Sequence, residues 1–180
     1  MKNECIKLFI ILFLDVATIS LLTLLNSDIS SLGIFLYLPA LFFFNSSLYL
    51  NQFNGIIVSI IIGLFLDEIL STPLGFHAIF LCLAFITGKN WIEYNTKRKP
   101  WRLVTFQLLT NIFCTIILFG IFLCKENLGV DWSYARFLID LIISSIIFIP
   151  ICFWKIEICR IIIQKMFEDT KNSEDLHEIK

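Results

Sequence analysis

The stretch GLFLDEILSTPLGFH, residues 63 to 77, places two acidic side chains between apolar runs that are each too short to cross a bilayer comfortably. Asp67 and Glu68 close the first run, and a Ser-Thr-Pro sequence separates it from the second. Charged side chains are costly in a bilayer core unless protein or a cavity surrounds them. The stretch therefore predicts a polar turn between two short helices, close to the outer membrane surface.

The residues of this turn indicate how the second helix begins. Pro73 suits the first helical turn, where its missing N–H and fixed φ are no handicap. Ser71 or Thr72 is then expected to cap that helix through its hydroxyl oxygen. Gly63 and Gly75 carry no side chain and are expected to let neighbouring backbone approach closely. Short apolar segments interrupted by Gly and Pro often mark binding sites in membrane proteins, so the turn is interpreted as either a partner-binding or a structural motif.

The composition of the whole chain argues against a water-soluble fold. Its 180 residues are 58% hydrophobic and 16% charged, with a mean hydropathy of +0.85. A soluble domain of this size could not bury that much apolar surface. The net charge of −1 also provides no strongly basic surface for nucleic acid. The sequence predicts an all-α integral membrane protein.

Six apolar segments approach the roughly 20 residues that a transmembrane helix needs. They are residues 6–25, 32–50, 55–70, 74–87, 103–124 and 137–158. The first carries Asp15 at its middle and lacks a small-residue cleavage site, so we expect a retained helix rather than a cleaved signal. We expect residues 1–163 to form a six-helix transmembrane domain, whose third and fourth helices are short, and residues 164–180 to form a polar cytoplasmic tail.

The distribution of Lys and Arg predicts the orientation of these helices. A cytoplasmic N-terminus places twelve basic residues inside, Lys155 among them, and only Lys125 and Arg136 outside. A five-span arrangement would move the C-terminal basic cluster to the wrong face. Both termini are therefore predicted to be cytoplasmic, in a multi-pass protein of the cell inner (cytoplasmic) membrane.

A basic and aromatic inner loop, GKNWIEYNTKRKPW, connects the fourth and fifth segments. Its positive charges include Lys97, Arg98 and Lys99, and Arg102 follows directly. Such a loop is either a surface bound to solvent or lipid headgroups, or a docking surface for a cytoplasmic partner. We expect it to bind anionic lipid or a partner rather than to stabilise the fold.

Four polar residues lie inside the apolar segments, where they are costly in lipid: Asp15, Asn45, Asn111 and Asp140. Each should face other helices or a cavity. Hydrogen bonds between helices that fix the packing are the favoured interpretation. A transport or proton path is the alternative, but no series of acidic residues follows the single carboxylate near the midplane.

The chain shows no catalytic signature, and we expect no enzymatic activity and no cofactor. Asp67, Glu68 and His77 could be imagined as a divalent metal site with two carboxylates and an imidazole. A third or fourth ligand is not evident, and a capped turn explains the acids without metal. We therefore predict no metal here and interpret His77 as a hydrogen-bonded residue near the membrane surface.

The turn resembles a motif of the rod shape-determining protein MreD family. That family typically shows a Gly, a following Asp, and then a small residue followed by Pro-Leu-Gly. The matching residues here are Gly63 and Asp67, then Thr72-Pro73-Leu74-Gly75, with His77 two positions on. Glu68 departs from the apolar residue expected beside the Asp. Length and hydropathy match over the whole chain, whereas the motif covers only residues 63 to 78.

The resemblance implies a non-enzymatic part of the bacterial cell-elongation machinery that organises peptidoglycan synthesis. The implied partners are an MreC-like protein and, directly or indirectly, an MreB-type filament, the RodA glycosyltransferase and a class B penicillin-binding transpeptidase. The outline is also similar to the substrate-binding membrane subunits of energy-coupling-factor vitamin transporters, which are six-helix proteins of this size. A vitamin binder should enclose a pocket of convergent polar and aromatic groups near the outer face.

The predicted orientation can be tested by cysteine-accessibility labelling in a background without the native cysteines. A single cysteine at position 97 should react only from the cytoplasmic side, and one at position 131 only from the outside, because the charge distribution places them on opposite faces. Labelling of both positions from the same side would rule out the six-span arrangement.

Overall fold

The computed structural model describes residues 2–94, 100–124 and 134–178, and all regular structure in these residues is helical. The elements are α1 (Lys2–Ile29), η1 (Ser30–Leu32), η2 (Pro39–Leu41), α2 (Phe44–Tyr49), α3 (Gln52–Ile69), α4 (Phe76–Tyr94), α5 (Pro100–Cys124) and α6 (Tyr134–Glu178), where η marks a 3₁₀ helix. This confirms the all-α class that the sequence predicts.

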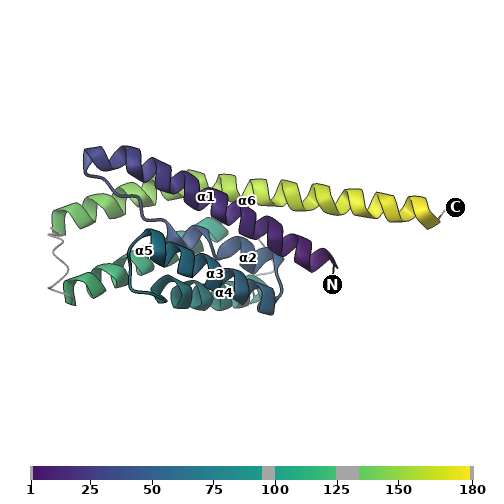
Figure 1. Cartoon of the computed structure of the whole chain (residues 1–180), viewed down its shortest axis with the longest axis horizontal. Coiled ribbons are helices and arrows are strands. Elements are labelled where there is room, and N and C mark those ends of the chain that lie inside the picture. The colour runs from purple at the N-terminus through teal and green to yellow at the C-terminus, as the bar shows by residue number, and fades with distance from the viewer. Residues whose placement is uncertain (1, 95–99, 125–133, 179–180) are drawn as a thin grey trace.

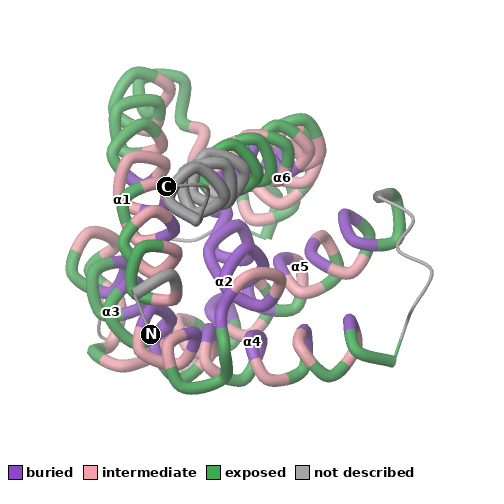
Figure 2. The backbone as a smooth tube through the Cα atoms, turned by 90° about the vertical axis from the view of Figure 1, so that its right-hand side faces the viewer, coloured by how far each residue is buried: buried purple, intermediate pink, exposed green. Residues whose placement is uncertain are grey.

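The long helices surround the short α2. Figure 2, which looks along the long axis of the molecule, shows α1, α3, α4, α5 and α6 arranged around it. The chain runs back and forth along that axis, and both termini lie at the same end (Figure 1). Helices α3 and α4 form the most extensive helix pair.

The second apolar segment, residues 32–50, is not the continuous membrane helix that the sequence predicts. After Gly33, whose φ is +72°, the chain is irregular up to residue 38 and then forms only η2 and the six-residue α2. Pro39 begins η2 and cannot donate a backbone hydrogen bond, which disfavours a longer helix through this position. The prediction is therefore wrong for this segment; residues 33–43 are named the unwound segment.

The unwound segment and α2 form the centre of the protein. Every residue from 36 to 47 is buried, and Figure 2 shows this part of the chain enclosed by the surrounding helices. Non-helical backbone at membrane depth is tolerated only where protein or water, rather than lipid, covers it. The surrounding helices supply that cover.

Two asparagine side chains on neighbouring helices bind the backbone of the unwound segment. On α1, Asn26 donates to the carbonyl of Leu36 (2.9 Å) and accepts from the N–H of the same residue (2.8 Å). On α5, Asn111 donates to the carbonyl of Tyr37 (3.1 Å) and accepts from the N–H of Ala40 (3.2 Å). Each amide thus replaces two hydrogen bonds that a regular helix would have made internally.

Helix α6 supplies two further acceptors to the same segment. Asp140 accepts from the N–H of Phe35 (3.1 Å), and the hydroxyl of Ser144 accepts from the N–H of Tyr37 (3.1 Å). Asn111 and Asp140 thus make hydrogen bonds that fix the packing, but their partner is the unwound segment rather than another long helix, and the buried Oδ1 of the fellow candidate Asn45 has no hydrogen-bond partner within the described residues.

A buried ion pair joins α1 and α6 beside the unwound segment. The Nζ of Lys155 lies 2.7 Å from Asp15, donates to the carbonyl of Leu41 (2.8 Å) and sits 4.3 Å from the ring centroid of Phe42. Lys155 is only 6% exposed. Lys155 is therefore a buried residue of the helix bundle rather than a solvent-exposed one, because an anion and a carbonyl oxygen compensate for its removal from water.

Four helices are long and apolar enough to cross a membrane, which indicates a multi-pass membrane protein. They cover Glu4–Leu32, Gln52–Ile69, Trp101–Leu123 and Tyr134–Met166. Two of the six expected spans do not meet this measure: residues 32–50 are not one helix, and α4 becomes polar after Thr87. The expected tail has no separate fold in its described part, because α6 continues without a break through Pro150 to Glu178.

The buried pair predicts a coupled effect on stability. Asp15→Asn and Lys155→Met should each lower the free energy of unfolding by about 3–5 kcal/mol, because each leaves the other charge buried without its partner. The double variant should lose less than the sum, although the carbonyl of Leu41 remains without its donor. Thermal unfolding of the purified protein in detergent measures these losses.

The exposed pair between Arg160 and Glu157, with an N···O distance of 2.6 Å, provides the control for this experiment. Arg160→Gln should change stability by less than about 1 kcal/mol, because water screens the pair. Strictly additive losses at Asp15 and Lys155 would contradict the coupling.

Candidate functional site

Asp67 is the centre of the connection between α3 and α4. Its Oδ2 accepts from the N–H of Gly75 (2.7 Å), and its Oδ1 accepts from the N–H of His77 (3.0 Å) and the hydroxyl of Thr72 (2.9 Å). The Nδ1 of His77 lies 2.7 Å from the same Oδ1. Asp67 is 2% exposed, so these bonds replace the water that a carboxylate would otherwise bind.

These bonds correct the expected capping of the second helix. Helix α4 begins at Phe76, after Pro73 rather than with it, and within the described residues no hydroxyl of Ser71 or Thr72 accepts a hydrogen bond from its first N–H groups. The carboxylate of Asp67, from the preceding helix, accepts the free N–H groups instead. A carboxylate can accept several donors at once, which a single hydroxyl cannot do as well.

A buried chain of polar groups runs from Asp67 towards α5. The Nε2 of His77 lies 2.6 Å from the hydroxyl of Tyr37, and that hydroxyl lies 3.3 Å from the Sγ of Cys114. In a neutral imidazole whose Nδ1–H donates to Asp67, Nε2 accepts from the Tyr37 hydroxyl. His77 is fully buried, deeper than the surface position expected from the sequence.

The chain from Asp67 to Cys114 joins three parts of the fold. It links the α3–α4 turn (residues 70–75) to the unwound segment through Tyr37 and then to α5. Asp67, His77 and Tyr37 each have a protein partner at every side-chain nitrogen and oxygen. Satisfied networks of this kind hold their members in one arrangement.

The two glycines of the motif have different roles. A Cβ at Gly63 would collide with the backbone N and Cα of Ala78, so this glycine permits the close approach of α3 and α4 that the sequence predicts. At Gly75 the corresponding space is empty, and the expectation of close approach there is wrong. Gly75 is needed for its φ of +88°, which side-chain-bearing residues rarely adopt.

The outer surface of the turn is formed by side chains that take no part in this network. Leu74 is 85% exposed, Glu68 and Ser71 are also exposed, and Pro73 is partly buried. Glu68 does not join Asp67 and His77, and no group of three potential metal ligands occurs in the described part of the chain. The turn therefore presents one large apolar side chain on a rigid base.

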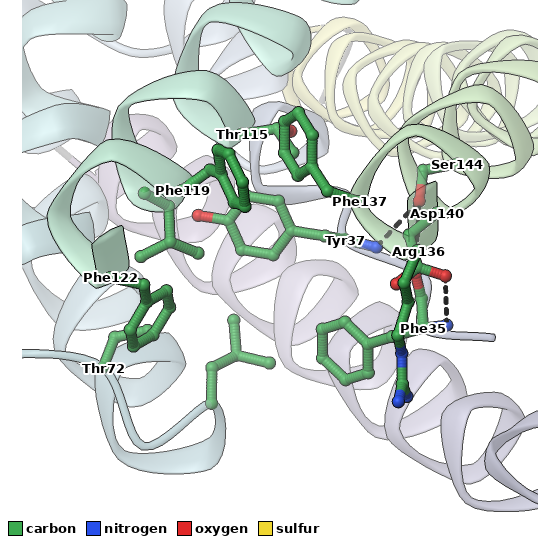
Figure 3. Close-up of a pocket in the computed structure, with 12 residues that line it drawn as sticks. Phe35, Tyr37, Thr72, Thr115, Phe119, Phe122, Arg136, Phe137, Asp140 and Ser144 are labelled. Carbon is green, nitrogen blue, oxygen red and sulfur yellow. Dashed lines mark hydrogen bonds between the residues drawn. The ribbon is translucent and has the colours of Figure 1, made fainter. Parts of the chain in front are cut away.

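A cavity of about 240 Å³ lies between the turn, the unwound segment, α5 and α6 (Figure 3). Tyr37 and Thr72, both members of the Asp67 network, form part of its wall. Most of the remaining wall is apolar and includes four phenylalanines, and Arg136, Asp140 and Ser144 supply its polar part on α6.

The structure brings some predicted site residues together and leaves others apart. Gly63, Asp67, Gly75 and His77 form one unit at the turn, and Glu68 and Pro73 lie outside this network, whereas Asp15, Asn111 and Asp140 support the unwound segment. Arg102 is exposed on α5. Lys97, Arg98 and Lys99 lie outside the described residues.

Sequence reasoning missed the contributions of Tyr37, Lys155, Asn26 and Ser144. Tyr37 and Ser144 lie in apolar runs without a spacing that links them to the turn. Asn26 follows the first apolar segment directly and resembles an ordinary end-of-helix residue. Lys155 lies within the sixth segment, three residues before its expected end, and this position was the one available signal of its burial.

The contrast between the glycines predicts an order of stability losses. Gly63→Ala should cause the largest loss of thermal stability in detergent, because its methyl group meets fixed backbone of α4. Gly75→Ala should cost about 1–2 kcal/mol through its positive φ. Gly120→Ala, in open space within α5, should be neutral or slightly stabilising. Equal effects at Gly63 and Gly120 would contradict the close approach.

Comparisons with family models, curated proteins and solved structures find no match to this chain.

Proposed function

We propose that this protein is a non-enzymatic component of the bacterial cell-elongation machinery, similar to MreD, that organises peptidoglycan synthesis with an MreC-like partner. The observation that carries the proposal is the arrangement of the resembling motif. Within this motif Gly63 lies against the backbone of α4 and Gly75 donates to Asp67, while Leu74 of the same motif is 85% exposed.

An exposed leucine on a rigid turn suits recognition of another protein. Binding energy at interfaces is concentrated in a few side chains that become fully buried, and preorganised positions lose little entropy on binding. The Asp67 network fixes the backbone on both sides of Leu74, through Thr72 and Gly75. We infer that the MreC-like partner covers Leu74.

The proposal includes the topology and the wider set of partners. Six segments cross the cytoplasmic membrane, with α4 as a short span and residues 32–50 as an irregular span covered by protein. Both termini and the basic loop at Lys97, Arg98 and Lys99 lie in the cytoplasm, where an MreB-type filament is accessible. RodA and the class B transpeptidase join directly or through the MreC-like protein.

Co-purification with the MreC-like partner tests the contact. Leu74→Ser should reduce the amount of recovered partner by about tenfold, corresponding to a hot-spot loss of about 1.4 kcal/mol or more. The abundance of the Leu74→Ser variant itself should stay normal, because the exposed side chain of Leu74 contributes little to the fold. Cells carrying it should lose control of rod width.

Leu83→Ser provides a matched control, since Leu83 is a leucine of α4 that is 60% exposed but lies away from the turn. It should leave co-purification unchanged. Normal partner recovery with Leu74→Ser, at normal protein abundance, would refute the proposed contact.

The cavity beside Tyr37 favours a second candidate, a substrate-binding subunit of an energy-coupling-factor-type vitamin transporter. Its aromatic wall with a few polar groups has the character of a small-molecule site. Native mass spectrometry of the protein as purified distinguishes the two. A bound water-soluble vitamin would support the transporter subunit, and its absence together with partner capture would support the elongation role.

A further inference from the structure

The cavity has a wall of two distinct kinds. Its apolar part includes five aromatic rings: Phe35, Tyr37, Phe119, Phe122 and Phe137. Opposite charges lie on α6, where Arg136 and Asp140 are one helical turn apart and both line the cavity (Figure 3). An occupant therefore meets apolar surface and both signs of charge.

Asp140 has acceptor capacity that the fold does not use. Its Oδ1 accepts from the N–H of Phe35 (3.1 Å), whereas its Oδ2 makes no hydrogen bond within the described part of the chain. Asp140 is only partly buried, so this oxygen can accept from an occupant of the cavity. A cationic or N–H-bearing group is the natural partner of a carboxylate oxygen.

The pair of charges selects among classes of ligand. A simple anion would be attracted by Arg136 but repelled by Asp140. A simple cation would be attracted by Asp140 but repelled by Arg136. A neutral hydrocarbon would leave the Asp140 carboxylate partly desolvated without compensation. A ligand that carries an anionic and a cationic group on an apolar body matches all parts of the wall.

We propose that this cavity binds a zwitterionic phospholipid, with its phosphate at Arg136, its ammonium group at Asp140 and part of one acyl chain against the aromatic rings. The position is appropriate for a lipid, because the cavity lies where α5 ends and α6 begins, at the end of the molecule away from the termini (Figure 1). Guanidinium groups bind phosphate in a bidentate geometry, and aromatic rings add a favourable surface for the ammonium group.

This proposal goes beyond the elongation role and does not depend on it. Lipid binding is measured on the purified protein alone, whereas the elongation role is measured by partner capture. One can therefore fail while the other holds.

The test uses the full chain, freed of lipid in detergent and examined by native mass spectrometry. Three probes are added separately: phosphatidylethanolamine, phosphatidylglycerol with the same acyl chains, and soluble phosphoethanolamine. The wild-type protein should retain phosphatidylethanolamine at least about tenfold better than either of the others. Equal retention of phosphatidylglycerol would overturn the zwitterion requirement, and retention of phosphoethanolamine alone would show a free zwitterion as the ligand and overturn the lipid.

Substitutions of residues that line the cavity test whether the lipid binds there. Asp140→Asn keeps an oxygen for the N–H of Phe35 but removes the charge, so it should abolish the preference for phosphatidylethanolamine while the protein stays folded. Arg136→Gln should weaken retention of both phospholipids. Thr115→Phe, which adds a ring to the wall and leaves both charges in place, should reduce retention at least about tenfold.

Arg160→Gln is the control, because Arg160 is an exposed cation far along α6 from the cavity. It should retain phosphatidylethanolamine like the wild type. If Asp140→Asn and Thr115→Phe, each with a normal thermal midpoint, bind like the wild type, the lipid lies elsewhere and the proposal is wrong.

Discussion

The need to satisfy buried backbone groups without water determines most of this structure. The unwound segment is buried among other helices, where neither water nor lipid can replace its missing hydrogen bonds. Asn26, Asn111, Ser144 and Lys155 supply these bonds from three different helices. Only Asn111 among them appears costly in the sequence, yet all four make an irregular centre possible, and they also fix where α1, α5 and α6 lie.

The polar turn between α3 and α4 extends the same principle. Asp67 replaces the first hydrogen bonds of α4, and through His77 it reaches the hydroxyl of Tyr37 in the unwound segment. The two irregular parts of the chain thus stabilise each other. A change at one is transmitted to the other by direct contacts, and both contribute to the wall of the same cavity.

The sequence predicted those features that depend on local pattern. The apolar runs predicted the five long helices, and the charged turn indicated that Asp67 and Gly63 are structurally important. Residues 32–50 were predicted wrongly because hydropathy measures only side chains. A buried irregular segment is as apolar as a membrane helix. The burial of Lys155 was not predicted because its compensating partner, Asp15, is 140 positions away in the sequence, and no local pattern reveals such a contact.

The distances along the chain between these partners impose an order on biogenesis. Lys155 is 114 residues after the carbonyl of Leu41 that it binds, and Ser144 is 107 residues after Tyr37. Synthesis of that interval takes on the order of ten seconds. During this time the unwound segment lacks the hydrogen-bond partners that α6 supplies. The full set of bonds that holds its irregular backbone is therefore complete only after α6 has been made.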